Sequence, residues 1–413
     1  MSLDIFLRRK LLVCLVIASV PTPFLAQAAG RTSDSRQTAI QFEEQGDFSR
    51  AQMSWESVLK LHPQDAEAHA HLGLLEARQE HYELASAHYK KALVLSPDMP
   101  GLRLNLGLAL FKGGKMKEAS TVFLPLLKNL PADSQEAIRV TTLIGLARFG
   151  AGDYAGAVPF LKKAVAADSQ NLPFRLTLAQ SCLWSKQYQC VLDVYHEIVN
   201  LNENSAEADM LAGQALDEMK DRPGAIEQFR AAVKADPKMP EAHFGLGYLL
   251  WGQLKFDEAA KELEAELTNN PDHAQALTYL ADCHIQMNNP EPAIPLLEKA
   301  VRLDPKIELA HVDLGVLYAN QGKNADALLE LKKAEKLDPT DQNVHWRLGR
   351  FYKSVGRKAE AEVEFQKTRN LQKAADKSIF DKLHSAQEKH ESANPPAPTA
   401  NGLNFDLEKS DLP

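Results

Sequence analysis

The chain has 413 residues, of which 45% are hydrophobic and 25% are charged, and its formal net charge is −8. An acidic protein repels the phosphate backbone, and the sequence shows no basic patch interleaved with aromatic residues, so nucleic-acid binding is excluded from the functions we consider. Length alone would suggest two or three domains.

The N-terminal segment 1–28 has the pattern of a secretory signal peptide. A basic start from Arg8 to Lys10 precedes the apolar run Leu11–Val20, Pro21 follows the run, and small residues surround Ala28. We therefore expect export, cleavage after Ala28 and a periplasmic location. The alternative is an uncleaved inner-membrane anchor, although the apolar run is short for about 30 Å of hydrocarbon. Membrane contact is expected only in that case.

From there the chain repeats with a period of about 34 residues, which indicates one small helical unit that is copied along the chain. Equivalent positions mark this spacing, and only the step from the third to the fourth is longer than the others: Pro63, Pro97, Pro131, Ser169, Glu203, Pro237, Pro271, Pro305 and Pro339. The sequence therefore predicts an array of similar units and not a set of unrelated domains.

Each repeat is predicted to be a pair of antiparallel helices. Apolar residues recur every three or four positions, a helical period, and glycines such as Gly46, Gly114 and Gly322 interrupt the repeat near its middle. Glycine ends the first helix, and the proline at the end of the repeat ends the second. Small residues, for example Gly73 and Ala85, allow the two backbones to approach, and a large residue such as Tyr89 fills the space beside them.

This pattern of leucine, small residue, alanine, aromatic residue and proline resembles the tetratricopeptide repeat (TPR) family. The family's tryptophan near the start of the first helix is replaced here, for example by His243 or His311. The resemblance implies an all-α fold, a right-handed TPR superhelix (α-solenoid) whose first helices line a concave groove. It covers residues 32–375 in ten repeats: 32–65, 66–99, 100–133, 138–171, 172–205, 206–239, 240–273, 274–307, 308–341 and 342–375.

The third to fifth repeats are the least regular. Pro125 falls inside a predicted second helix, which it should bend because an internal proline costs about 3 kcal/mol. The segment Ser134 to Ala137 is inserted after it, and Val191 replaces the paired alanine of the fifth repeat. Two explanations stay open, namely neutral drift and a local change of superhelical pitch at a binding site.

Cysteines are few. Cys182 is expected on the first helix of the fifth repeat and Cys190 at the start of its second, so a disulfide across the helix pair is one possibility, which export would permit. The alternative is that both are small apolar packing residues. Cys283 is expected to be unpaired and buried.

Apolar and aromatic residues also recur on a second face of the first helices. In the seventh repeat Phe244, Tyr248 and Trp251 are spaced i, i+4 and i+7. By the TPR resemblance these positions face the groove, where they would anchor a peptide. Packing between neighbouring first helices is the alternative. The predicted groove residues are Leu104, Leu108, Phe111, Phe149, Leu183, Trp184, Phe244, Tyr248, Trp251 and Trp346. At the same positions the first and tenth repeats carry more polar residues, including Arg36, Glu43, Arg350 and Lys353.

After the repeats we expect a capping helix over 376–391, where Ile379, Phe380 and Leu383 would cover the exposed apolar end. From Ser392 the composition turns to Pro, Ala and Asn, which predicts a disordered tail over 392–413. Its Leu403–Leu407 segment is either a docking peptide or a chance apolar cluster.

The sequence contains no pattern that would carry catalysis. It lacks a His-Glu-x-x-His motif, a phosphate-binding loop, a Gly-x-Ser-x-Gly motif and a Cys-x-x-Cys motif. Its thirteen histidines are scattered, and pairs such as His69 with His71, or His81 with His88, are more typical of packing than of metal binding. We therefore expect no catalytic residue, metal or cofactor.

The predicted function is a non-catalytic protein-interaction scaffold of the bacterial cell envelope that holds a partner protein or peptide in the groove. The alternative is a membrane-tethered assembly accessory of a secretion, pilus or polysaccharide-export machine.

Overall fold

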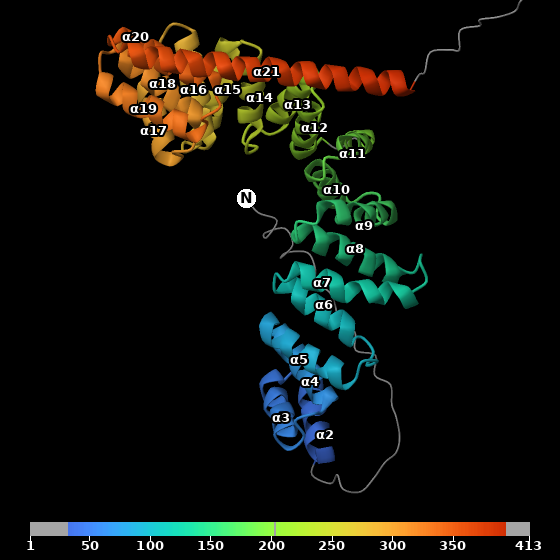
Figure 1. Ribbon diagram of the computed structural model, residues 1–413. Helices are drawn as coiled ribbons and strands as arrows, with labels where there is room; N and C mark the ends of the chain where they lie inside the picture. Colours follow the sequence, from blue (N-terminus) through green and yellow to red (C-terminus); the bar gives the residue numbers. More distant parts are fainter. Residues whose placement is uncertain (1–31, 202–203, 394–413) are drawn as a thin grey trace, which may run out of the picture. The chain divides into compact units, whose positions relative to one another are not determined.

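The computed structural model describes residues 32–201 and 204–393, with side chains from 35 to 379, and every element in these ranges is a helix (Figure 1). The predicted all-α solenoid is therefore confirmed. The described residues up to 242 and those from 243 onward form two compact parts, which we call the N-terminal and C-terminal modules. The predicted signal peptide, 1–28, lies outside the described residues.

The N-terminal module contains the first six helix pairs. In chain order its helices are α2 (Thr32–Glu44), α3 (Phe48–Leu61), α4 (Ala66–Arg78), α5 (Tyr82–Leu95), α6 (Leu102–Lys112), α7 (Met116–Phe123) with the 3-10 helix η1 (Leu124–Asn129), α8 (Gln135–Gly150), α9 (Tyr154–Ala167), α10 (Leu172–Trp184), α11 (Tyr188–Asn200), α12 (Ala206–Glu218) and α13 (Arg222–Ala235).

The C-terminal module contains four more pairs. Its helices are α14 (Ala242–Gly252), α15 (Phe256–Asn269), α16 (Ala274–Gln286), α17 (Ala293–Leu303), α18 (Glu308–Asn320), α19 (Asn324–Leu337), α20 (Gln342–Ser354) and α21 (Lys358–Ala393). In both modules the two helices of a repeat pack along each other, for example α12 with α13 and α18 with α19. The second helix of a repeat then packs against the first helix of the next one, for example α5 against α6 and α15 against α16.

One residue with positive φ separates the two helices of every repeat. Five repeats use the predicted glycine, with φ between 75° and 81°: Gly46, Gly114, Gly152, Gly322 and Gly356. The other five repeats place a residue with a side chain in this left-handed conformation: Glu80, Lys186, Lys220, Leu254 and Asn288. The turn is therefore set by the repeat geometry and not by glycine alone.

Leu254 is the least suited of these residues, because it is branched, has φ of 61° and leaves its side chain 73% exposed. Leu254→Gly is expected to raise the free energy of unfolding of the C-terminal module by about 1 kcal/mol, since glycine avoids the left-handed penalty. Urea unfolding would measure the change. The reverse substitution at the equivalent turn, Gly322→Leu, should lower the free energy of unfolding by a similar amount. If both substitutions change this free energy in the same direction, the explanation is refuted.

Close helix approach explains the small and large residues of the repeat. A Cβ atom on Gly73 of α4 would lie 2.7 Å from the ring of Tyr89 on α5, a ring that is itself 1% exposed. On α14, a Cβ atom on Gly247 would lie 2.8 Å from Cγ of Leu263. Interiors are packed too densely to absorb such an atom. In most repeats the large residue is therefore buried directly against the backbone of the partner helix.

The proline and the insertion of the irregular repeats both become part of helical segments. Pro125 ends α7 at Phe123, and the chain continues as the 3-10 helix η1. Ser134 caps α8 by accepting from the Ala137 amide, so the rest of the insertion forms the start of that helix. The insertion is close to one helical turn in length, and α8 is accordingly longer than the other first helices, at 16 residues.

The predicted separate capping helix over 376–391 is wrong. The second helix of the tenth repeat, α21, runs without interruption from Lys358 to Ala393, so the predicted tail begins too early, at Ser392. This segment contains neither glycine nor proline and is rich in Ala, Lys, Glu and Gln, so nothing in it ends a helix. Ile379 is 58% exposed and covers no apolar end. The side chains of Phe380 and Leu383 and the segment 394–413, with its Leu403–Leu407 cluster, lie outside the description.

Helices long and apolar enough to cross a bilayer do not occur between residues 32 and 393 as far as these are described.

Candidate functional site

The ten predicted groove residues differ in how much surface they present. Trp184, Tyr248 and Trp346 are 48%, 39% and 37% exposed. Five others are half-buried: Leu104, Leu108, Leu183, Phe244 and Trp251. Phe111 and Phe149 are buried, at 4% and 5% exposure, so for these two the expectation of an open groove position is wrong. Both belong to the apolar core of the N-terminal module.

In the N-terminal module the exposed aromatic residue is Trp184, at the end of α10. It stacks on Phe149 of α8, with ring centroids 5.7 Å apart and planes at 14°, and it lies 4.5 Å from the ring of Tyr154. The Phe149 ring therefore supports Trp184 from beneath. This cluster offers a partner one indole face.

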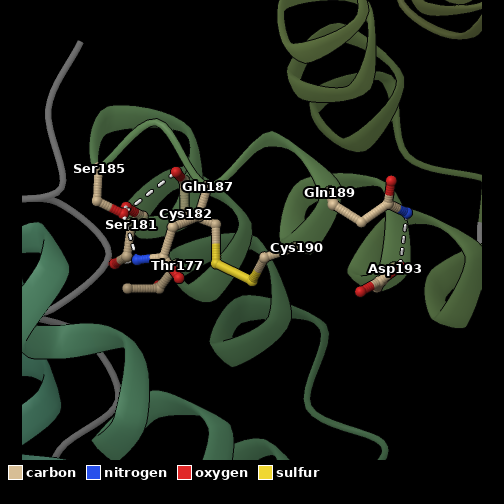
Figure 2. The surroundings of a disulfide bond; sticks show 8 residues. All are labelled: Thr177, Ser181, Cys182, Ser185, Gln187, Gln189, Cys190 and Asp193. Atoms are coloured by element: carbon tan, nitrogen blue, oxygen red, sulfur yellow. Dashed lines mark hydrogen bonds between the residues drawn. A yellow bond between two sulfur atoms is a disulfide. The ribbon is translucent and has the colours of Figure 1, made fainter. Parts of the chain in front are cut away.

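A disulfide joins the two helices of the same repeat. Figure 2 shows Cys182 of α10 bonded to Cys190 of α11, with Cα atoms 5.9 Å apart and an S–S distance of 2.09 Å. Cys182 is fully buried, and Cys190 is half-buried. Cys283 is free and buried, and burial raises the pKa of its thiol to about 12. The bridge therefore fixes the helix pair that carries Trp184.

In the C-terminal module four aromatic rings meet on neighbouring first helices, and we call them the aromatic cluster: Phe244, Tyr248 and Trp251 of α14, and Tyr279 of α16. The Tyr279 ring lies 4.9 Å from Trp251 and 5.2 Å from Tyr248, edge to face in both cases. Tyr248 stacks on Trp251 at 6.1 Å. Burial and the neighbouring Tyr248 and Asp282 raise the pKa of Tyr279 to about 12, so its hydroxyl group keeps its proton.

Acidic residues lie beside the aromatic cluster. The Trp251 indole Nε1 donates to Asp282 Oδ2 at 2.6 Å, and Gln286 donates to the other Asp282 oxygen at 3.0 Å. Asp313 of α18 is 9% exposed, and its Oδ2 atom has no hydrogen-bond partner among the described residues. Burial and the Asp282 charge raise the pKa of Asp313 well above its usual value. Burial, Asp341 and Asp338 raise the pKa of Glu308 to about 7.

Sequence reasoning missed Tyr279, Asp282 and Asp313. Tyr279, Asp313 and Arg347 are each separated by one repeat period, so they occupy one position on three successive first helices, next to the position we had predicted. That regular spacing was the signal that could have found them.

Trp346 forms a different surface on α20. The guanidinium groups of Arg347 and Arg350 lie 5.1 and 4.9 Å from the centroid of its ring. An indole face covered by two cations is a poorer apolar anchor than Tyr248.

Several histidines at the position of the missing tryptophan are structural. His311 Nδ1 lies 2.6 Å from Glu330 and Nε2 lies 3.0 Å from the Pro305 carbonyl oxygen. His345 repeats this arrangement with Glu364 and the Pro339 carbonyl, at 2.7 and 2.9 Å. Both ring nitrogens lie within hydrogen-bond distance of oxygen atoms, which fixes the orientation of each ring.

The pair of His345 and Glu364 lies in a group of side chains of the types that bind metal ions. Ligand atoms of Glu335, His345 and Glu364 all lie within 4.8 Å of one another. However, Lys367 binds Glu335 at 2.9 Å and Glu364 at 3.2 Å, and both nitrogens of His345 are already engaged. These residues form an ion-pair network, and its lysines occupy the place where a cation would bind.

The second repeat departs from this pattern, because a histidine replaces the glutamate. His69 faces His88, with Nδ1 atoms 3.0 Å apart, and His69 Nε2 lies 3.2 Å from the Pro63 carbonyl oxygen. The two pairings considered from sequence are wrong: His71 binds Glu43 and His81 binds Glu76, each at 2.9 Å. Burial lowers the pKa of both His69 and His88.

This pair should make the N-terminal module sensitive to acid. The unfolded imidazoles gain protons below about pH 6.5 while the folded pair resists them, so stability is full above that pH and falls below it. His88→Glu would recreate the pairing of His311 with Glu330. Between about pH 7 and pH 5 the variant should lose about 1 kcal/mol less of its free energy of unfolding than the native chain. Urea unfolding at both pH values would test this, and an unchanged pH dependence would contradict it.

Comparison with known proteins adds the family context. Models described as "Tetratricopeptide repeat" match residues 148–216, 210–253, 245–307 and 284–342. Residues 36–147 match the "Cilia and flagella-associated protein 70 middle TPR-like domain".

Individual relatives are distant. "Cellulose synthase operon protein C" of Xanthomonas axonopodis pv. citri (strain 306) is 25% identical over 311 residues, 69% of this chain and 20% of that protein. "BBSome complex member BBS4" of Bos taurus is 24% identical over 222 residues, 54% of this chain and 42% of that protein. The chain thus spans less than half the length of the curated relatives it matches.

Two solved structures are similar to parts of the chain. The "APC/C hetero-tetramer Cut9-Hcn1" structure has a TM-score of 0.40 at 14% identity, covering 83% of this chain and 88% of that chain. "YrrB: a TPR protein with an unusual peptide-binding site" has a TM-score of 0.38 at 19% identity, covering 46% and 97%.

Proposed function

Tetratricopeptide repeats are detected over residues 148–342, and on that premise we propose that the chain is a non-catalytic scaffold that holds a polypeptide partner. The partner would bind the face formed by the first helices of the C-terminal module, with apolar side chains against the aromatic cluster. Arrays of this kind serve as extended recognition surfaces.

The observation that carries the proposal is the exposure of Tyr248. Its ring is 39% exposed, yet Trp251 and Tyr279 hold it on two sides. A rigid aromatic side chain that stays accessible is typical of the residues that dominate binding energy at protein interfaces. The half-buried Phe244 extends the same apolar surface, with its ring 6.3 Å from Tyr248.

Affinity capture from bacterial envelope extract with the folded chain would test the proposal. A variant with Phe244→Ala, Tyr248→Ala and Trp251→Ala should lose a partner that the native chain retains, and Tyr248→Ala alone should weaken it. Leu329→Ala with Val363→Ala is the matched control, since these apolar residues are 55% and 56% exposed on second helices of the same module. If all these variants capture the same proteins equally, the aromatic cluster does not bind the partner.

We further propose that the protein works in the bacterial envelope, in the periplasm. The leader-like residues 1–28 support this, and the disulfide between Cys182 and Cys190 suits an oxidising compartment. Mass spectrometry after alkylation without reductant should find these two cysteines bonded in the native protein. Alkylation of both would argue against an envelope location.

A membrane-tethered assembly accessory is the second candidate. The 311-residue likeness to a protein named "Cellulose synthase operon protein C" favours a role beside polysaccharide export, although this chain spans only 20% of that protein. N-terminal sequencing of the native protein separates the two candidates. A start beyond Ala28 supports the released scaffold, and an intact leader supports the anchor.

A further inference from the structure

Asp313 is a buried carboxyl group without a visible purpose in the fold. It lies on α18, is 9% exposed, and leaves its Oδ2 atom without a hydrogen-bond partner among the described residues. A buried acceptor that is left unpaired is costly, and a buried charge is more so. Tyr279, Asp313 and Arg347 occupy the same position of successive first helices, so Asp313 belongs to the face that carries the aromatic cluster.

The charged groups that act on Asp313 are mainly acidic. Asp282 of α16 and Glu308 of α18 both disfavour its ionisation, and among the described residues Arg347 of α20 is the cation that favours it. Arg347 does not pair with Asp313 among the described residues: its Nε atom donates to Asn343 at 3.3 Å, and its guanidinium lies over the Trp346 ring. This part of the face therefore contains three carboxyl groups and one guanidinium group, so positive charge is in deficit.

The neighbouring groups indicate which cation would fit. Both oxygens of Asp282 already accept hydrogen bonds, from Trp251 and Gln286, so few lone pairs remain for a metal ion. Rings of Trp251 and Tyr279 adjoin Asp282, and such rings attract the cation and cover the methylene groups of a long side chain. A lysine or arginine side chain matches both features.

Resting on the proposed function, we propose that the bound polypeptide places a lysine or arginine side chain beside the aromatic cluster, with its cation paired to Asp313. In the free protein burial and the neighbouring acids raise the pKa of Asp313, which favours its protonated form. The incoming cation favours the ionised form, so this proton is released to solvent on binding. The partner's chemistry is thus a basic residue flanked by apolar ones.

Selection of random peptides displayed on phage against the full chain tests both proposals separately. Peptides enriched on the native chain should carry an excess of lysine or arginine next to apolar residues, relative to the starting library. Enriched peptides without that excess would overturn the basic-anchor proposal while keeping the proposed function. If no peptide is enriched, or if enrichment survives the triple alanine variant of the aromatic cluster, the proposed function fails as well.

Calorimetry on one enriched peptide then measures the pairing. Changing its lysine or arginine to methionine, or changing Asp313→Asn in the protein, should weaken binding by about tenfold or more, as for other charge-assisted hydrogen bonds. Asp326→Asn is the matched control, because Asp326 is exposed on the second helix α19 of the same module. The affinity of the Asp326→Asn variant for the peptide should stay within about twofold of that of the native protein.

A second readout does not depend on the variant folding. Titrations of the native protein in buffers of different ionisation enthalpy should show proton release on binding, and affinity should rise with pH. Peptide binding with no proton release, or equal loss of affinity in Asp313→Asn and Asp326→Asn, would overturn the pairing.

Discussion

Replacing Phe123 with alanine is expected to lower the free energy of unfolding of the N-terminal module by about 3–5 kcal/mol. Phe123 ends α7, is fully buried, and packs against the backbone of Gly107 on α6. No neighbouring side chain can fill the space that its ring leaves, since interiors of this kind are densely packed. Because α7 ends at Phe123 and the 3-10 helix η1 follows, this ring is the last buried side chain of the helix.

Urea unfolding followed by circular dichroism would measure this change. Leu84→Ala on α5 is the control, because Leu84 is 54% exposed and its truncation should cost no more than about 0.5 kcal/mol. A loss below about 1 kcal/mol for Phe123→Ala would show that the large residues of the repeats do not hold the helix pairs together.

Asp313→Asn is expected to raise the free energy of unfolding of the C-terminal module by about 2–4 kcal/mol near pH 8, because it removes a buried acid that ionises more readily in the unfolded chain. Residues held at a cost to stability are typical of binding sites. The same substitution should therefore weaken peptide binding while it stabilises the fold.

The pH dependence of this gain follows from the sign of the shift. Burial and Asp282 raise the folded pKa of Asp313 above its usual 3.8. Between that value and the higher folded pKa, unfolding releases a proton, so native stability falls as pH rises through this window. The gain from Asp313→Asn should be near zero below about pH 4 and should grow as pH rises. A gain that is equal at both pH values would mean that Asp313 is not the group responsible.

The repeat architecture could be predicted because one pattern is copied ten times, so residues such as Gly46 and Tyr89 specify the same helix pair in each copy. The continuity of α21 was missed because the expected boundary came from the period, while the residues around 376 contain nothing that ends a helix. Sequence also could not separate Phe149 from Tyr248. The difference arises from the next first helix, which covers Phe149 with Trp184 and leaves Tyr248 accessible.

The acidic site shows a second limit. Nothing in the sequence around Asp313 marks it as unusual. Its destabilising effect depends on the charges of Asp282, Glu308 and Arg347, which act on it once three repeats have stacked. Such a property belongs to contacts between repeats, which the pattern within one repeat does not specify.

Photo-crosslinking from the aromatic cluster is the most direct test of the central claim, that this face of the C-terminal module holds a partner polypeptide. Benzoylphenylalanine would replace Tyr248 in one strain and Leu329, on the second helix α19, in another. We predict one dominant crosslinked protein from position 248 and none of it from position 329. No crosslink at 248, or the same products from both positions, would contradict the claim.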